Sequence, residues 1–299
     1  MQKALQYLKR HWIAYLMVLP FALGVCVFAV YPPLQGIIIS FFDVYKVTDS
    51  LNSFIWFENF KLLFQDTIFL HSFETMFTLQ LPRLIVNLSI PFIYAELIFH
   101  VTDKKTQGAY RFLLLLPTVC PGIVSSLIWQ NIYAYEGGIL NEILKGLGLI
   151  KQNIHFLGQE HIKGALVFMG FPWLPGTSGL IVLAGLINIP SEVLEATKLD
   201  GCGRLRRIFV IDFSYLIGQI KYVVVFGIIG IFQDYSNQLL FAEKVGTAIH
   251  VPAYYMYQLV NTNQTIGKAA AIGVVLFLII MLITAATYKF LNGKDEENV

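Results

Sequence analysis

Residues 269–290 read AAAIGVVLFLIIMLITAATYKF, an apolar run whose one charged residue is Lys289. A helix needs about 20 apolar residues to cross the hydrocarbon core of a bilayer. Lipid offers no hydrogen bonds, so a crossing segment has to pair its backbone groups internally, as a helix does. The run therefore predicts a membrane-spanning helix.

Five earlier stretches have the same character, at residues 12–31, 73–99, 110–134, 163–187 and 208–233. Only 13% of the residues are charged, about half of the roughly 25% typical of soluble domains. The sequence predicts an all-α integral membrane protein with six transmembrane helices, in which residues 1–299 form one transmembrane domain. The net charge of +2 does not indicate a nucleic-acid partner. Cys26, Cys120 and Cys202 lie too far apart for a CxxC site or a disulfide framework, and we expect them to be packing residues.

The orientation follows from the basic residues, which collect in cytoplasmic connections. Three basic groups fall on one side of six spans: Lys3, Lys9 and Arg10; Lys104, Lys105 and Arg111; Lys198, Arg204, Arg206 and Arg207. No small-x-small cleavage site follows the first apolar stretch, so we expect a retained helix rather than a signal peptide. Both termini and the connection at residues 188–207 are therefore predicted to be cytoplasmic.

Prolines interrupt the predicted spans. Pro32 and Pro33 are expected to end the first span, and six others fall inside later ones: Pro82, Pro91, Pro117, Pro121, Pro172 and Pro175. A proline removes a helical hydrogen bond and kinks or breaks the helix. Broken backbone at membrane depth occurs where protein or a water-filled path surrounds it. The prolines fit a transport pathway, with ordinary kinking in a helix bundle as the alternative.

The connection between the fourth and fifth spans reads PSEVLEATKLDG over residues 190–201. We expect a short helix outside the bilayer that is capped by Ser191. Glu192 and Glu195 fall in its first turns and Lys198 near its end, where the helix dipole favours each charge. Gly201 is expected to supply a left-handed stop, after which a second helix leads into the fifth span. On physical grounds alone, this segment is either a docking surface or a helical ornament of a loop.

Residues 195–211, EATKLDGCGRLRRIFVI, resemble the EAA loop of binding-protein-dependent ABC importer permeases. Blocks similar to the sugar-permease branch of that family extend over nearly the whole chain: Tyr15–Pro20, Tyr31–Asp43, Phe57–Phe60, Arg111–Pro117, Gly137–Asn141 and Ala269–Ala271. Thr197 and Cys202 stand where the family has alanine, and Ser214 stands where it has proline. The outer loop expected at residues 241–250 lacks the family's Gly-Gly-Pro turn.

The resemblance implies the fold of a type I ABC importer permease in a bacterial inner membrane, which imports a carbohydrate and is not an enzyme. The implied partners are a second homologous permease subunit, two cytoplasmic ATPase subunits, an extracellular solute-binding protein and the sugar. Seven residues of the coupling loop, 188–207, are expected to contact the ATPase: Glu192, Glu195, Ala196, Lys198, Asp200, Gly201 and Arg204. Because the chain has no GxxxxGK[ST] phosphate loop, ATP and Mg are expected on the ATPase, with no cofactor, metal or catalytic residue here.

Polar residues are costly inside a membrane, so those in the spans are candidates for a substrate path. The candidates are Arg83, Asn87, Trp173, Gln233, Asp234, Tyr235 and Asn237. Arg83 and Asn87 lie four residues apart and share a helix face. Amides, charges and rings together suit a hydroxyl-rich ligand. The alternatives are helix-to-helix hydrogen bonding and, at the end of the fifth span, an interfacial location.

Two other functions compete with that of an importer, an intramembrane protease and a secondary transporter. Residues 176–179, GTSG, match the GxSG of rhomboid proteases, but those enzymes need a histidine on the sixth span, which this chain lacks. The small residues are then read as close helix packing. A secondary transporter of a small polar solute needs coupling residues at mid-membrane, and away from their ends the spans carry few charges beyond Arg83, Asp212 and Lys221. Inverted repeats, frequent in such carriers, are not evident.

Overall fold

The computed structural model of the protein describes residues 11–46, 53–174, 176–262 and 265–292. The expectations for Lys3, Lys9, Arg10 and Pro175 fall outside these residues. The chain divides into two compact units: unit 1 is Met1–Asp66 with Met256–Val275, and unit 2 is Thr67–Tyr255 with Leu276–Val299. The single domain expected over residues 1–299 stays a prediction.

Unit 1 begins with one long helical segment, made of α2 (Trp12–Val25), the π-helix η1 (Cys26–Val30) and α3 (Tyr31–Ile39). The prediction that Pro32 and Pro33 end the first span is therefore wrong. Both prolines stand in the first turn of α3, where a missing N–H and a fixed φ are tolerated. The wider π-helix just before them absorbs the change in hydrogen-bond pattern.

The rest of unit 1 is a small assembly held by hydrogen bonds. Its elements are the antiparallel pair β1 (Phe42–Asp43) and β2 (Ser53–Phe54), α4 (Glu58–Gln65), and parts of α16 (Pro252–Asn261) and α17 (Ile266–Asn292). The buried Asn59 of α4 donates from Nδ2 to the carbonyl oxygens of Ser40, at 2.9 Å, and Phe42, at 3.0 Å. Lys268 of α17 pairs with Asp66, which ties the start of α17 to the end of α4.

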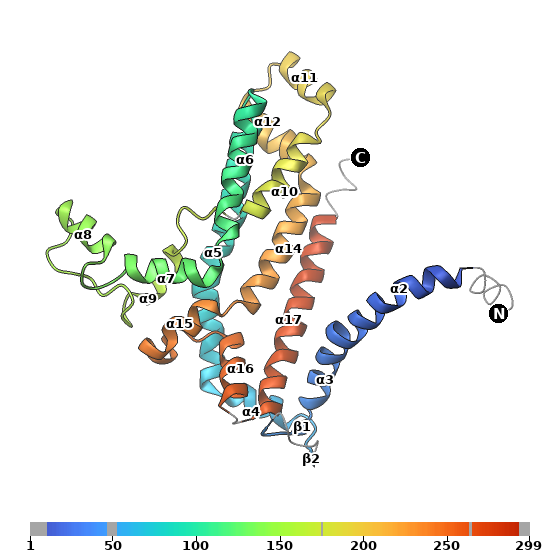
Figure 1. Ribbon diagram of the computed structural model, residues 1–299, viewed down its shortest axis with the longest axis vertical. Helices are drawn as coiled ribbons and strands as arrows, with labels where there is room; N and C mark the ends of the chain where they lie inside the picture. The colour runs from blue at the N-terminus through green and yellow to red at the C-terminus, as the bar shows by residue number, and fades with distance from the viewer. Residues whose placement is uncertain (1–10, 47–52, 175, 263–264, 293–299) are drawn as a thin grey trace. The chain divides into compact units, whose positions relative to one another are not determined.

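Unit 2 is built around α5 (Thr67–Phe99), as Figure 1 shows. The helices that pack against α5 include α9 (Ile162–Phe168), α10 (Gly176–Ile187) and α14 (Ile217–Gln233). The helix α6 (Lys104–Val119) packs in turn against α10. The shared core includes Tyr94 and Ala95 of α5 together with Leu183, Leu186 and Leu216.

Close contact between these helices depends on small residues. A Cβ atom added at Gly176 would overlap the carbonyl oxygen of Leu114, and one added at Gly179 would overlap the ring of Tyr94. The GTSG sequence therefore allows close helix packing, which is the interpretation favoured over a protease motif.

Individual prolines have different effects in unit 2. The helix α5 runs as one element through Pro82 and Pro91, because neighbouring helices in a bundle compensate for a lost hydrogen bond. By contrast, the predicted span at 110–134 breaks beside Pro121 into α6 and α7 (Gly122–Ile132), which meet at 85°. The predicted span at 163–187 also breaks, between α9 and α10, where Phe171–Pro172 is a cis peptide.

Four helical segments within the described residues are long and apolar enough to cross a membrane: Trp12–Ile39, Thr67–Phe99, Ile217–Ile249 and Ile266–Lys289. Two bent pairs, α6 with α7 and α10 with α11 (Ser191–Leu199), raise the number to six if each pair counts as one span. The protein is thus a multi-pass helical membrane protein.

Cys26 and Cys120 are exposed on this chain, so the prediction that they are packing residues is wrong within it.

The segment that leads into α14 is irregular. It consists of α12 (Arg204–Arg207), the π-helix η2 (Ile208–Asp212) and α13 (Phe213–Tyr215), with a break at Leu216. Ser214, which stands where a proline was expected, donates from Oγ to the carbonyl oxygen of Val210 at 2.7 Å. Such back-bonding bends helices, so the break does not require the proline.

Residues 241–250 do not form the outer loop that the sequence suggested. They complete α15 (Ser236–Val245) and form the 3-10 turn η3 (Gly246–Ile249), which packs against α5. Phe241 and Ile249 are fully buried. Connecting loops run over the surface, whereas these two side chains are packed inside unit 2. The remaining helix of unit 2, α8 (Ile139–Gly146), contacts α7.

Candidate functional site

The helix α11 begins directly after Pro190, whose backbone has φ −56° and ψ 138°. The amide N–H groups of Val193 and Leu194 donate to the carbonyl oxygen of Pro190, at 3.1 and 3.3 Å. Ser191 is the first helical residue, and no side chain caps this end, so the prediction that Ser191 is the cap is wrong. The carbonyl oxygen of Pro190 accepts these first hydrogen bonds of the helix, and the proline ring fixes φ at this residue, directly before the helix.

The other end of α11 closes as the sequence predicts. Gly201 has φ +65°. Its N–H donates to the carbonyl oxygen of Lys198 at 3.2 Å, and the N–H of Cys202 donates to that of Thr197 at 3.0 Å. These two hydrogen bonds form a Schellman motif, in which a left-handed residue ends a helix and reverses the chain. The segment is therefore a helix, a tight glycine turn and a second helix.

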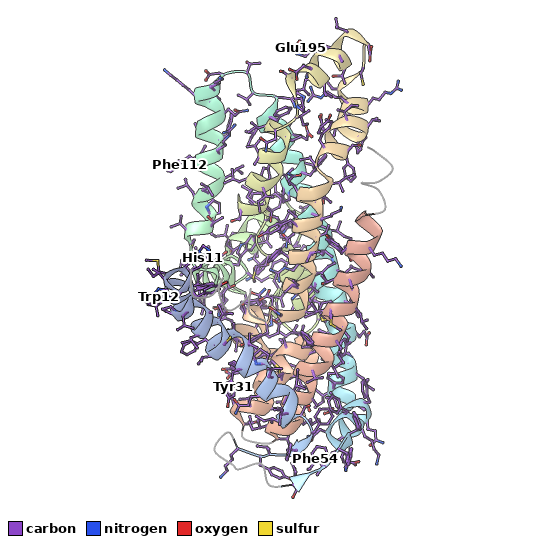
Figure 2. All side chains as sticks on the ribbon, turned by 90° about the vertical axis from the view of Figure 1, so that its right-hand side faces the viewer. His11, Trp12, Tyr31, Phe54, Phe112 and Glu195 are labelled. Atoms are coloured by element: carbon purple, nitrogen blue, oxygen red, sulfur yellow. The ribbon has the colours of Figure 1, made fainter. Side chains whose placement is uncertain are left out.

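One face of α11 packs against the rest of unit 2, and the opposite face is exposed. Val193 and Leu194 contact the core and Thr197 is buried. Figure 2 shows Glu195 at the end of unit 2 where α11 lies. All the residues predicted to contact a partner are exposed there: Glu192, Glu195, Ala196, Lys198, Asp200, Gly201 and Arg204. Sequence reasoning missed two exposed leucines beside them, Leu199 and Leu205, which are 88% and 73% exposed. Two apolar side chains on a charged tip are typical of a protein-binding surface.

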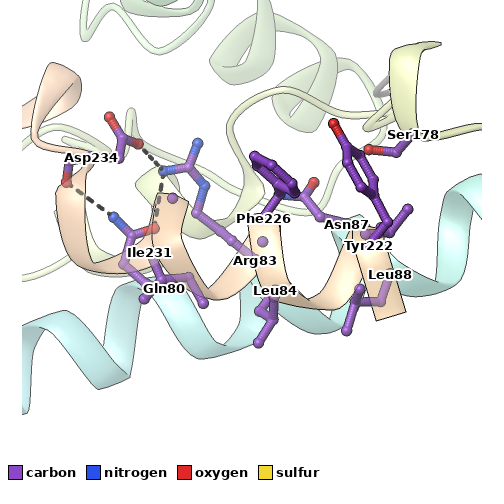
Figure 3. Close-up of a pocket in the computed structure, with 13 residues that line it drawn as sticks. Gln80, Arg83, Leu84, Asn87, Leu88, Ser178, Tyr222, Phe226, Ile231 and Asp234 are labelled. Carbon is purple, nitrogen blue, oxygen red and sulfur yellow. Dashed lines mark hydrogen bonds and ion pairs between the residues drawn. The ribbon is translucent and has the colours of Figure 1, made fainter. Parts of the chain in front are cut away.

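A cavity of about 300 Å³ lies between α5, α10 and α14 (Figure 3). Its polar lining residues are Gln80, Arg83, Asn87, Ser178, Tyr222 and Asp234. Three of these come from one face of α5, where positions three and four residues apart are neighbours. The rest of the lining is largely apolar, with Leu84, Leu88, Val223, Phe226 and Ile231 among it.

The polar groups of the cavity are loosely paired. Nη1 of Arg83 lies 3.5 Å from Oδ2 of Asp234 and 3.5 Å from Oε1 of Gln80. Nε2 of Gln80 donates to the backbone oxygen of Asp234 at 3.4 Å. These contacts are at the long end for hydrogen bonds. Donors and acceptors thus remain available to a polar solute that enters the cavity.

The predicted path residues separate into two groups. Arg83, Asn87 and Asp234 line the cavity. Asn237 lies outside it, buried in α15, where its Oδ1 accepts a hydrogen bond from Ser126 Oγ at 3.0 Å.

The other three candidates do not line the cavity either. Trp173 lies between α9 and α10, not on a helix, with φ 51° and its ring against Phe168 and Phe171. Gln233 ends α14, and Tyr235 precedes α15. The sequence did not single out Gln80, Ser178 and Tyr222; Gln80 lies three residues before Arg83, which was an available signal. Within the described residues, no cluster of three or more His, Cys, Asp or Glu side chains could hold a metal ion.

Comparison with solved structures decides the fold. A chain in a crystal structure of a bacterial ABC transporter that imports the acidic polysaccharide alginate superposes with a TM-score of 0.83 at 21% identity, over 97% of this chain and 98% of that one. A second structure of a bacterial alginate ABC transporter, in complex with a periplasmic protein that holds an alginate pentasaccharide, gives a TM-score of 0.81 at 22% identity. The fold is that of an ABC importer permease. The expected permease fold is confirmed, whereas the six spans and the cytoplasmic position of the termini stay predictions.

Sequence comparison agrees with the permease fold. The sulfoquinovosyl glycerol permease SmoG of Agrobacterium fabrum is 28% identical over 95% of this chain and 91% of its own length. The arabinooligosaccharide permease AraP of Halalkalibacterium halodurans is 27% identical over 94% of this chain and 88% of its own. No protein-family profile matches the chain. The homologues are permeases of ABC sugar uptake systems, which favours a transport subunit over an intramembrane protease or a secondary transporter.

Proposed function

We propose that the chain is the transmembrane permease subunit of an ATP-driven importer that brings a carbohydrate into a bacterial cell across the inner membrane. The observation that carries this proposal is the cavity of unit 2. Arg83, Asn87 and Asp234 stand there among apolar helices, and polar side chains at such positions mark solute pathways. A hydroxyl-rich solute replaces the long contacts between these groups with its own hydrogen bonds.

The substrate class is supported by chemistry and by likeness. Similar permeases are named for sulfoquinovosyl glycerol, arabinooligosaccharides and sn-glycerol-3-phosphate. The cavity offers guanidinium and amide donors, a carboxylate acceptor, and the rings of Tyr222 and Phe226. An apolar pocket with a few convergent polar groups is the usual form of a small-molecule site, and this mixture suits a sugar or a sugar derivative.

In this proposal, the free energy that drives transport comes from ATP hydrolysis on a separate polypeptide. Two cytoplasmic ATPase subunits hold ATP and Mg, and α11 seats in a cleft of one of them. Glu195 makes polar contacts in the cleft, Leu199 and Leu205 make apolar ones, and the Gly201 turn carries the movement into α12. Closure of the ATPases then shifts the permease between inward-open and outward-open states, a rigid-body change biased by nucleotide. A second homologous permease subunit completes the pathway, and an extracellular solute-binding protein delivers the sugar.

The test is uptake of labelled sugars, in the presence of the solute-binding protein, into liposomes that contain this chain with its second permease subunit and its ATPase. We expect uptake only when ATP and the ATPase are both present. Uptake by this chain alone, driven by an ion gradient, would refute the proposal and support a secondary transporter.

A further inference from the structure

A cluster of charged and polar side chains around two buried carboxyl groups joins the segment after α11 to the end of α5. Its members are Glu96 and Phe99 of α5, His100 directly after this helix, Arg207 of α12 and Asp212 of η2. Glu96 is 5% exposed and Asp212 is fully buried. Buried charges are costly to keep in a protein, so the cluster calls for a physical explanation.

Arg207 makes three directed contacts within the cluster. Its Nε donates to Oδ2 of Asp212 at 3.0 Å. Its Nη2 lies 3.1 Å from Nε2 of His100, and its guanidinium lies 5.6 Å from the centre of the Phe99 ring. A planar guanidinium can hold a carboxylate, an imidazole and a ring face at once, which a lysine cannot.

The imidazole of His100 contacts Arg207 through one ring nitrogen and the backbone of α5 through the other. A guanidinium only donates hydrogen bonds, so Nε2 of His100 accepts. The proton is therefore on Nδ1, which lies 2.8 Å from the backbone oxygen of Glu96. Arg207 is thus tied to the last turn of α5 through a side chain with a defined tautomer.

Some carboxyl oxygens of the cluster accept no hydrogen bond. Both carboxyl oxygens of Glu96 and Oδ1 of Asp212 have no hydrogen-bond partner among the described residues. The Glu96 Oε2 atom lies 3.8 Å from Nδ1 of His100, too far for a hydrogen bond. Buried polar atoms nearly always have a hydrogen-bond partner, so buried carboxyl oxygens without one are exceptional. They are acceptors that no donor among the described residues uses.

The cluster lies between the coupling loop and the helix that lines the cavity, α5. Arg207 lies six residues after the Gly201 turn, and α5 carries Arg83 and Asn87 on the wall of the cavity. From Arg83 to Glu96, α5 covers about 20 Å at 1.5 Å per residue. Apolar packing between the same elements is not directional, whereas the Arg207 contacts are.

We propose that Arg207 is a positioning residue that transmits displacement of the α11–α12 segment to α5, and that it exchanges Asp212 for Glu96 as its acceptor during the transport cycle. The inference rests on the proposed importer function. It adds a defined route from the ATPase contact to the solute cavity, along one helix.

The test measures the number of ATP molecules hydrolysed per sugar imported by the reconstituted complex. Glu96→Gln removes no hydrogen bond of this structure, so the complex assembles, and we expect the ratio to rise at least threefold because the second acceptor loses its charge. A variant that removes the charges as a set, Arg207→Met with Asp212→Leu and Glu96→Gln, keeps the apolar packing, and we expect at least a tenfold rise. Arg207→Lys should lie between wild type and this variant.

Arg206→Met is the matched control, because Arg206 is an exposed arginine on the same helix, and its ratio should equal that of wild type. An unchanged ratio in Glu96→Gln, or in the assembled charge-free variant, overturns the inference while leaving the importer function intact. A wild-type complex whose uptake does not depend on ATP overturns both.

Discussion

Replacement of Gly201 by alanine isolates the contribution of the glycine turn after α11. The residue has φ +65°, and a Cβ atom built there meets no atom within 4 Å. The penalty is therefore conformational rather than steric. A left-handed backbone costs an L-residue about 1–2 kcal/mol. Because this cost lets the turn of the free permease leave its native conformation, binding weakens by up to about 5- to 30-fold.

Gly203 provides a control on the same turn. It has φ −64°, which alanine adopts readily, and a Cβ atom there also meets nothing within 4 Å. Gly203→Ala should keep its affinity within about threefold of wild type. Gly201→Asn should lose less than Gly201→Ala, because asparagine tolerates left-handed backbone better than alanine does.

The assay is titration of the detergent-solubilised permease with its ATPase, with thermal unfolding of each variant as a check on the fold. A Gly201→Ala permease that binds as tightly as wild type refutes the reasoning. Equal loss in Gly201→Ala and Gly203→Ala also refutes it, because the sign of φ would then not matter.

Three further outcomes follow from the structure. Arg83→Ala should lower sugar uptake by about tenfold or more, the effect of losing one charge-assisted hydrogen bond, while ATPase binding stays unchanged in the same titration. Gly179→Ala should destabilise unit 2 by about 1–3 kcal/mol, measured by thermal unfolding, because its Cβ overlaps the Tyr94 ring, whereas Gly218→Ala, which meets no neighbour, should not. Burial lowers the pKa of His250 from its usual 6.5. Folding therefore favours the neutral imidazole, and the stability of the protein should fall as the pH drops below 6.5. The variant His250→Gln should show a smaller fall.

The features that the sequence predicted correctly are local. A run such as 269–290 needs only its own composition to indicate a membrane helix. The stop at Gly201 depends on the conformational freedom of one residue and on hydrogen bonds to carbonyl groups three and five residues earlier. The start of α11 was assigned to Ser191 because serine is a common cap, but the backbone of Pro190 sets it instead.

The features that were missed depend on distant parts of the chain. Gln80 contacts Asp234, 154 residues away, and the Arg207–His100 contact joins residues 107 apart. No periodicity along the chain reports such pairs. Trp173 was placed on a helix because an apolar pattern surrounds it, whereas the backbone there leaves the helix between α9 and α10.

Photocrosslinking from α11 to the ATPase tests the central claim most directly. A photoreactive amino acid at position 195, on the exposed face of α11, should label the ATPase with a yield that changes when ATP is added. The same group at position 142, exposed on α8 and away from α11 (Figure 1), should not label it. Labelling from position 142 but not from 195 would contradict the assignment of α11 as the helix that receives the ATPase.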